Sequence, residues 1–184
     1  HNIDYLGVAF ADEGVKLRKA GISSKIIVMN PDEESISDIL EYRLEPEIYN
    51  FRIFDAFLEY SADHSVRKLP IHIKLDTGMN RLGFSEKDID RLTERILRED
   101  NIVVKSVFSH LVAADEPEHD EFTDEQITKF KYLGDRIVSE LNYPLIRHIA
   151  NTSGIERFPH AAFDMVRIGI GLYGFSNKDN DKLM

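Results

Sequence analysis

The sequence predicts an α/β fold in which parallel strands alternate with helices. Short apolar segments alternate about seven times with longer amphipathic segments, and turn residues separate them. This alternation is typical of β/α repeats around a parallel sheet with helices outside it. An open doubly wound sheet and a closed barrel both fit the pattern.

The expected elements follow from the period of the apolar residues. Strands are expected at residues 5–10, 25–29, 47–51, 70–76, 102–110, 146–150 and 165–170. Helices are expected at residues 11–20, 34–42, 52–60, 85–98 and 123–141, with a short one between the last two strands.

Three helix ends carry local signals. Gly21 is a common stop after a first helix, and Ser85 with Asp88 is expected to cap the fourth. Thr123 and Gln126 have the spacing of a capping box, so we expect them to open the longest helix.

Composition excludes several classes of protein. The chain has 184 residues, enough for one domain with a core, and a net charge of −10 without a basic stripe, which argues against a nucleic-acid partner. There is no cysteine, so thiolate metal sites, disulfides and thiol nucleophiles are excluded, and a reducing compartment such as the cytoplasm fits. No apolar segment has the roughly 20 residues of a membrane helix, so no membrane partner is expected.

The ends of the sequence suggest part of a larger protein. The chain opens at His1 almost directly into the apolar segment 3–10, and no signal peptide is visible. Residues 177–184 are polar and are expected to fray or to lead into a further segment.

Polar residues lie at the ends of four of the expected strands. They are Lys74 and Asp76, His110, Asn151 and Thr152, and Arg167. In a barrel, all of these strand ends would meet on the rim that carries the active site. The simpler explanation is that strand ends meet water and are often polar. We favour a site.

Two familiar motifs are weak here. Asp76-Thr77-Gly78 is the triplet of aspartic proteases, but that chemistry needs two such loops on an all-β scaffold. The segment 169–174 has the glycine spacing of a dinucleotide fingerprint, yet it lies far from a first βα turn. Its glycines could still let backbone N–H groups approach a phosphate.

Other candidate residues have plain alternatives. Lys74 could form a Schiff base, but a buried lysine neutralised by Asp76 or by modification is favoured. His110 is as well explained by a core histidine as by a catalytic one. A possible metal-ligand cluster is interpreted as solvated surface, so no metal is expected; its residues are His119, Asp120, Glu121 and Asp124.

Three blocks of the sequence resemble the alanine racemase family, fold-type III enzymes that use pyridoxal 5'-phosphate (PLP). The blocks are residues 72–83, residues 108–115, and residues 151–153 together with 163–174. The whole chain can be aligned with the family's barrel domain. The resemblance therefore implies a single TIM-type (β/α) barrel domain fragment over residues 1–184, with about seven parallel strands.

The resemblance implies roles for the cofactor-binding residues. Arg167 matches the arginine that donates to the pyridine nitrogen of PLP, and a guanidinium leaves that ring a weaker electron sink than a protonated ring. Thr152, Gly169 and Ile170 match positions that hold the phosphate, and Asn151 would support them.

Catalytic roles are implied for three further residues. His110 matches a histidine that bridges the arginine to a catalytic tyrosine. Arg81 matches an arginine near the cofactor and the substrate carboxylate. Lys74 matches a lysine that family members carry as a carbamate, which holds that arginine in place.

The departures from the family are equally informative. No motif here matches the family's first strand, whose lysine binds PLP covalently, and the C-terminal β domain with its catalytic tyrosine is absent. We therefore expect an incomplete barrel that is inactive alone and binds PLP at most non-covalently. Thr152 stands where serine is usual, and Asn80 replaces a frequent glycine.

The implied parent is a homodimeric, cytoplasmic racemase that interconverts L- and D-alanine by a two-base mechanism and supplies D-alanine for the cell wall. Two alternatives are a non-catalytic PLP-binding barrel module and a racemase of another small amino acid such as serine.

Overall fold

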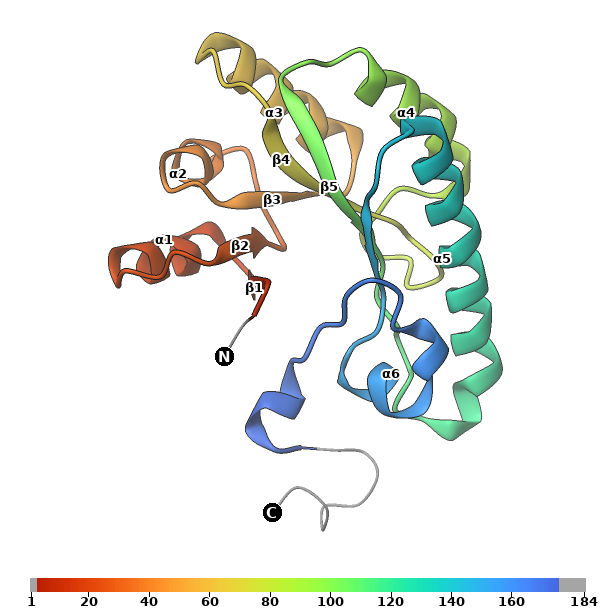
Figure 1. Ribbon diagram of the computed structural model, residues 1–184. Coiled ribbons are helices and arrows are strands. Elements are labelled where there is room, and N and C mark those ends of the chain that lie inside the picture. The colour runs from red at the N-terminus through yellow and green to blue at the C-terminus, as the bar shows by residue number, and fades with distance from the viewer. Residues whose placement is uncertain (1–2, 176–184) are drawn as a thin grey trace. The chain divides into compact units, whose positions relative to one another are not determined.

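The computed structural model describes residues 3–175 (Figure 1). Six parallel strands are hydrogen-bonded in chain order, β1-β2-β3-β4-β5-β6, and helices connect them. The fold class is therefore the α/β barrel type that the sequence predicts, with six strands rather than about seven. The polar segment 177–184 lies outside the described residues.

The chain divides into two compact units. The first comprises residues 3–74 and 94–105, and the second comprises residues 75–93 and 106–175. The chain passes from one unit to the other directly after residue 74, then within α4 and within β5.

The first unit holds the N-terminal β/α repeats. Its elements are β1 (Tyr5–Val8), α1 (Ala11–Lys19), β2 (Lys25–Val28), α2 (Ile36–Glu41), β3 (Glu45–Ile48), α3 (Phe51–Asp63) and β4 (Leu69–Lys74). Local signals mark two helix ends in this unit, of which the stop at Gly21 was expected and the N-cap at Asn50 was not. Gly21 has a φ of 87°, which closes α1, and the Asn50 side chain accepts the Ile53 N–H at 2.9 Å, which caps α3.

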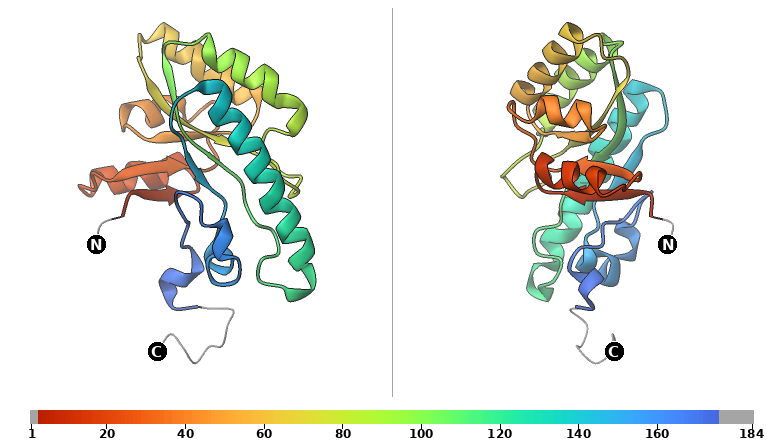
Figure 2. Two further views of the ribbon diagram at one scale, coloured as in Figure 1. Left: turned by 45° about the vertical axis from the view of Figure 1, so that its right-hand side comes forward. Right: turned by 90° about the vertical axis from the view of Figure 1, so that its left-hand side faces the viewer.

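The second unit contains the longest helix and the irregular C-terminal segment. The remaining elements are η1 (Glu86–Asp88), α4 (Ile89–Leu97), β5 (Ile102–Phe108), η2 (Pro117–His119), α5 (Asp120–Leu141), β6 (Ile146–His148), α6 (Thr152–Arg157), η3 (Pro159–Ala161) and η4 (Ile170–Tyr173). Ser85 and Asp88 form the predicted cap at η1. The two views of Figure 2 show α5, in teal, as one continuous helix.

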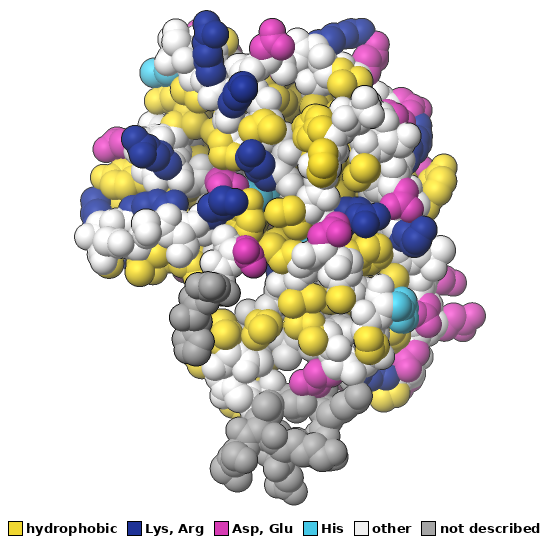
Figure 3. Space-filling view, in the orientation of Figure 1, with side chains coloured by type: hydrophobic (Ala, Val, Ile, Leu, Met, Phe, Trp, Pro, Cys, Tyr) yellow, Lys and Arg dark blue, Asp and Glu magenta, His cyan; other side chains and the backbone are white. Residues whose placement is uncertain are grey.

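Strand β4 is buried on both faces. In β4, the apolar Ile71 and Ile73 are buried as expected, and so are His72 and Lys74 on the opposite face. Such burial is typical of parallel sheets covered by helices. The face of the molecule in Figure 3 has acidic and basic side chains interspersed. No helix in residues 3–175 is long and apolar enough to span a membrane.

Three local predictions were wrong. The strand expected at 165–170 does not form. Near this segment, only two backbone hydrogen bonds join the chain to β6 and the residues after it. They run from Asp164 N to Arg147 O and from Arg167 N to Ala150 O. Those bonds are three residues apart, which does not match the two-residue period of a strand.

The third strand lies at Glu45–Ile48 rather than 47–51, and residue 51 already begins α3. Thr123 and Gln126 do not open α5, which begins at Asp120. Both side chains are fully buried within the helix instead.

Candidate functional site

The segment after β4 forms a tight turn built on Asp76. Its carboxylate Oδ1 accepts the N–H groups of Gly78 and Asn80, each at 3.0 Å. Asn80 has a φ of 55°, a conformation that glycine and asparagine adopt most readily, so either residue suits this position. Gly83 has a φ of 127°, and a Cβ there would lie 2.6 Å from Asp76 N. The Asp76 carboxylate thus shapes this turn, in contrast to a protease carboxylate.

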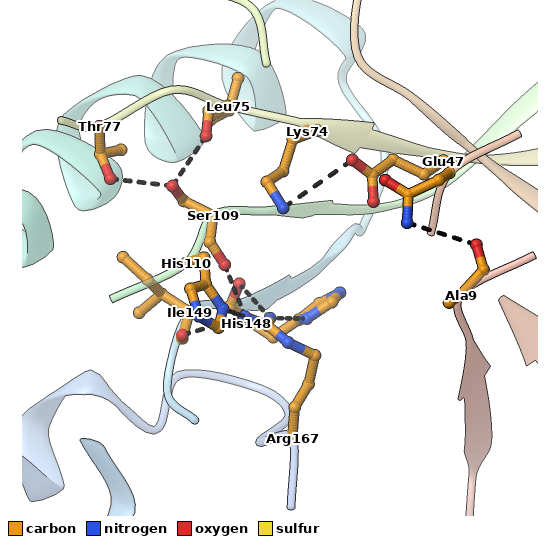
Figure 4. Close-up of polar contacts among 11 residues, drawn as sticks. Ala9, Glu47, Lys74, Leu75, Thr77, Ser109, His110, His148, Ile149 and Arg167 are labelled. Atoms are coloured by element: carbon orange, nitrogen blue, oxygen red, sulfur yellow. Dashed lines mark hydrogen bonds and ion pairs between the residues drawn. The ribbon is translucent and has the colours of Figure 1, made fainter. Parts of the chain in front are cut away.

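A buried chain of hydroxyl groups lies beneath this turn. Ser109 Oγ donates to Leu75 O at 2.7 Å and lies 2.8 Å from Thr77 Oγ1 (Figure 4). A serine has one hydroxyl proton, so Thr77 must be the donor to Ser109. These bonds join the segment after β4 to the segment after β5.

Arg167 is held mainly by backbone carbonyl groups. Its Nη2 donates to Ser109 O at 2.7 Å and to Ile149 O at 3.2 Å, and its Nη1 donates to His148 O at 3.3 Å. Nη2 also lies 3.5 Å from His110 Nδ1. The strand ends therefore fix both the position and the orientation of this cation (Figure 4).

His148 is a member of this cluster that the sequence did not reveal. Its Nδ1 lies 2.6 Å from Arg167 Nη1, and its Nε2 lies 3.1 Å from Ser106 Oγ. The ring stacks on Phe108 with centroids 4.7 Å apart, and the Arg167 guanidinium lies 5.3 Å from the centre of the same Phe108 ring. The only sequence signal was a histidine within an apolar strand, which is also typical of a core residue.

Thr152 and two glycines form a small polar cradle. Thr152 Oγ1 accepts the N–H groups of Gly169 and Gly171, each at 3.2 Å. A Cβ at Gly171 would lie 2.8 Å from Thr152 Cγ2, so only glycine allows this close approach. A Cβ at Gly169 would meet nothing within 4 Å, and Ile170 is 56% exposed. The predicted phosphate-holding residues are therefore neighbours in space.

Asn151 supports this cradle from one side. Its Oδ1 accepts the Gly154 N–H at 3.0 Å and so caps α6, and its Nδ2 donates to Leu111 O at 3.1 Å. Asn151 thereby ties the start of α6 to the segment that carries His110.

The remaining two predicted residues are Lys74 and Arg81. Lys74 belongs to the first unit, is 7% exposed, and lies 3.8 Å from Glu47 Oε1. Lys74 is thus buried beside a carboxylate as expected, but that carboxylate is Glu47 rather than Asp76, whose Oδ1 accepts backbone N–H groups of its own turn. Arg81 is exposed on the Asp76 turn and makes no ion pair within residues 3–175.

Thus the second unit brings His110, Arg167, Asn151, Thr152, Gly169 and Ile170 onto neighbouring segments. Two of the three acidic residues considered as metal ligands have other partners: Asp120 pairs with Arg157, and Asp124 pairs with His160.

Comparison with known proteins gives the same assignment as the motifs. The family described as "Alanine racemase, N-terminal domain" matches residues 1–177. The chain belongs to this alanine racemase family.

Curated relatives agree with that assignment. The alanine racemase of Thermodesulfovibrio yellowstonii is 38% identical over 173 residues, which cover 94% of this chain and 45% of that protein. The alanine racemase of Symbiobacterium thermophilum is 35% identical over 175 residues, covering 93% of this chain and 45% of that protein. The chain thus spans about half the length of these racemases.

Solved structures of alanine racemases share the fold. The enzyme from the D-cycloserine-producing Streptomyces lavendulae superposes with a TM-score of 0.90 at 27% identity, over 99% of this chain and 49% of that chain. Alanine racemase of Clostridium difficile 630 gives 0.88 at 28% identity, over 97% and 47%. The resemblance seen in the three sequence blocks is confirmed, and so is the incomplete α/β barrel.

Proposed function

We propose that this chain is the barrel portion of a PLP-dependent racemase that interconverts L- and D-alanine. The arrangement around Arg167 carries the proposal. A permanently charged guanidinium is fixed by three backbone carbonyls and lies beside two histidines. Such rigidity is unusual for a surface arginine and suits a group that must meet a planar ring in one orientation.

The residues of the cradle fit the phosphate of this cofactor. The Thr152 hydroxyl accepts two N–H bonds, so its own proton can be donated to a phosphate oxygen. The N–H groups of Gly169 and Gly171 are held by Thr152 Oγ1, and the open space at Gly169 lets an anion approach this hydroxyl and the backbone beside it. We therefore assign Thr152, Gly169 and Ile170 to the phosphate, with Asn151 positioning the start of α6.

The other site residues of the chain hold and orient the cofactor and the substrate. PLP, when bound, supplies the electron-withdrawing ring that makes the α-proton of an amino acid acidic. Arg167 would donate a hydrogen bond to the ring nitrogen and keep its own proton, because a guanidinium stays charged at neutral pH. His110, in contact with Arg167, orients the tyrosine contributed from elsewhere in the protein. Arg81 meets the substrate carboxylate, and Lys74 supports it.

Racemisation by a two-base mechanism needs one base on each face of the α-carbon. In the proposed reaction, these are a lysine and a tyrosine, and no motif in this chain matches either. We therefore expect the 184-residue chain to be inactive by itself, and the complete homodimer to supply D-alanine for the cell wall. The cysteine-free sequence is in keeping with a cytoplasmic enzyme.

The decisive experiment measures D-alanine formation from L-alanine by chiral chromatography. The complete protein should racemise alanine, its Arg167→Lys variant should be at least tenfold slower, and the 184-residue chain should give no product. Racemisation by the isolated chain would contradict the assignment of both bases. Faster turnover of serine would favour a different small amino acid, and binding of PLP without turnover would favour a non-catalytic module.

A further inference from the structure

Gln126 is a fully buried side chain on α5 that bonds to two separate loops. Its Nε2 donates to His110 O at 3.1 Å and lies 3.4 Å from Thr77 Oγ1. Its Oε1 accepts the Val112 N–H at 3.1 Å. One amide group thus serves the loop after β4 and the loop after β5.

These partners define which way the amide faces. His110 O is a carbonyl group and can only accept, whereas Val112 N–H can only donate. Exchanging the oxygen and nitrogen of Gln126 would leave both groups without a suitable partner, at a site from which water is excluded. Neither a carboxylate nor an apolar side chain can satisfy the same set.

The amide also begins a directed chain of hydrogen bonds. Gln126 donates to Thr77, Thr77 donates to Ser109, and Ser109 donates to Leu75 O. Each hydroxyl has only one proton to donate. Because Ser109 donates its proton to Leu75 O, Thr77 must donate to Ser109 and can only accept from Gln126. The chain ends on the backbone that leads into the Asp76 turn.

The loops joined in this way carry functional groups. Ser109 O is the carbonyl nearest to Arg167 Nη2, at 2.7 Å, and His110 follows it directly. The Asp76 turn carries Arg81 and lies against α5, where a Cβ at Gly78 would come within 3.0 Å of Phe122.

We propose that Gln126 is a positioning residue, which sets the backbone of residues 109–112 and of the Asp76 turn so that Arg167, His110 and Arg81 are correctly placed. Its effect on turnover rests on the proposed racemase function. Its effect on the geometry of the two loops does not.

The test compares Gln126→Glu and Gln126→Leu with Thr123→Val. Thr123 is also fully buried, lies one turn earlier on α5, and bonds only to the backbone of its own helix segment, at His119 O. The control therefore loses a buried hydrogen bond without disturbing either loop.

The test uses two measurements: NMR on the 184-residue chain and kcat on the complete protein. In the chain, NMR should show that Gln126 variants exchange the Val112 amide hydrogen at least tenfold faster and shift the side-chain signals of His110 and Arg167, whereas Thr123→Val does neither. In the complete protein, kcat should fall at least tenfold for Gln126 variants at temperatures where all variants are folded, and by less than twofold for the control.

Equal kcat and equal NMR signals in Gln126 and Thr123 variants would overturn the proposal. If the complete protein does not racemise any amino acid, the proposed function fails, and the NMR comparison still decides the role of Gln126. If the Gln126 variants do not fold, Thr77→Val interrupts the same chain from the turn and should produce the same displacement of the Ser109 segment.

Discussion

Nδ1 of His148 lies 2.6 Å from Nη1 of Arg167, and this contact decides the protonation of the histidine ring. A guanidinium can only donate, so Nδ1 must accept. The ring proton is then on Nε2, from which it is donated to Ser106 Oγ at 3.1 Å. The phenyl ring of Phe108, stacked at 4.7 Å, holds the imidazole plane in the orientation that both contacts need.

This relationship predicts the Nε2–H tautomer for His148 in the 184-residue chain. Two-bond ¹H–¹⁵N spectra distinguish the two neutral tautomers directly. Ser106→Ala should preserve the pattern, because Arg167 alone imposes it, whereas Arg167→Gln should release it and give a mixture. An Nδ1–H pattern in the unaltered chain would show that the Arg167 contact is misplaced.

A second prediction concerns the positive φ of Asn80. Asn80→Gly should change the free energy of unfolding by no more than about 0.5 kcal/mol, because glycine adopts this conformation without strain. Asn80→Ala should lose about 1 kcal/mol, because a Cβ without a polar side chain is disfavoured there. Chemical denaturation of the three chains at one temperature makes the comparison. Equal stability of the alanine and glycine variants would argue against the left-handed conformation.

The sequence predicted the repeats well because parallel strands and their helices have different apolar periods. The third strand was misplaced because Glu45 and Glu47 look like surface residues. In the structure Glu45 is buried beside His72 and Glu47 is buried beside Lys74, both on β4. No local sequence pattern reveals such pairs. The last expected strand was predicted from its apolar alternation. It does not form because the regular backbone hydrogen bonds to a neighbouring strand are not made.

The site was predictable where residues follow strand ends and unpredictable where they lie inside elements. His110 and Thr152 lie shortly after the ends of β5 and β6, whereas Arg167 lies in the expected strand that does not form and was singled out by the resemblance of its sequence block. His148 lies within β6, and Gln126 lies within α5, where the spacing from Thr123 is equally compatible with a helix start and with a buried helix face. Only the long-range contacts of the folded chain separate those two interpretations.

A third prediction tests the cradle at Thr152. In the complete protein, Thr152→Val should weaken PLP binding at least about tenfold, because a hydrogen bond to a charged phosphate contributes roughly 1.5–3 kcal/mol. Thr152→Ser keeps the hydroxyl, so its Kd for PLP should stay within about twofold of that of the unaltered protein. A twofold change is well below the roughly 1.4 kcal/mol that corresponds to a tenfold change in Kd. Absorbance titration with PLP measures both.

Pyridoxal, which has no phosphate group, is the matched ligand for that experiment. Its affinity should be the same for the valine and serine variants. A parallel loss of pyridoxal binding in Thr152→Val would show that the substitution disturbs the ring site, and that the cradle does not hold the phosphate.

The fourth prediction follows from the buried His72 on β4. Burial lowers the pKa of His72 below its usual 6.5, although the hydrogen bond from its Nε2 to Glu45 Oε2, at 2.8 Å, acts in the opposite direction. The charges of Lys105 and Lys25 lower it further, and the Tyr5 ring packs edge-on at 5.5 Å. His72 is therefore neutral in the folded chain at a pH where the unfolded chain already binds a proton.

The sign of the pH dependence follows from that difference. Below pH 6.5 the unfolded state binds the additional proton, so the free energy of unfolding should decrease as the pH falls through the window between 6.5 and the lower folded-state pKa. The slope contributed by one histidine is at most about 1.4 kcal/mol per pH unit. Urea denaturation from pH 7.5 downwards should show this slope in the unaltered chain and a shallower one in His72→Gln. A His72→Gln chain with the full slope would mean that another group is responsible.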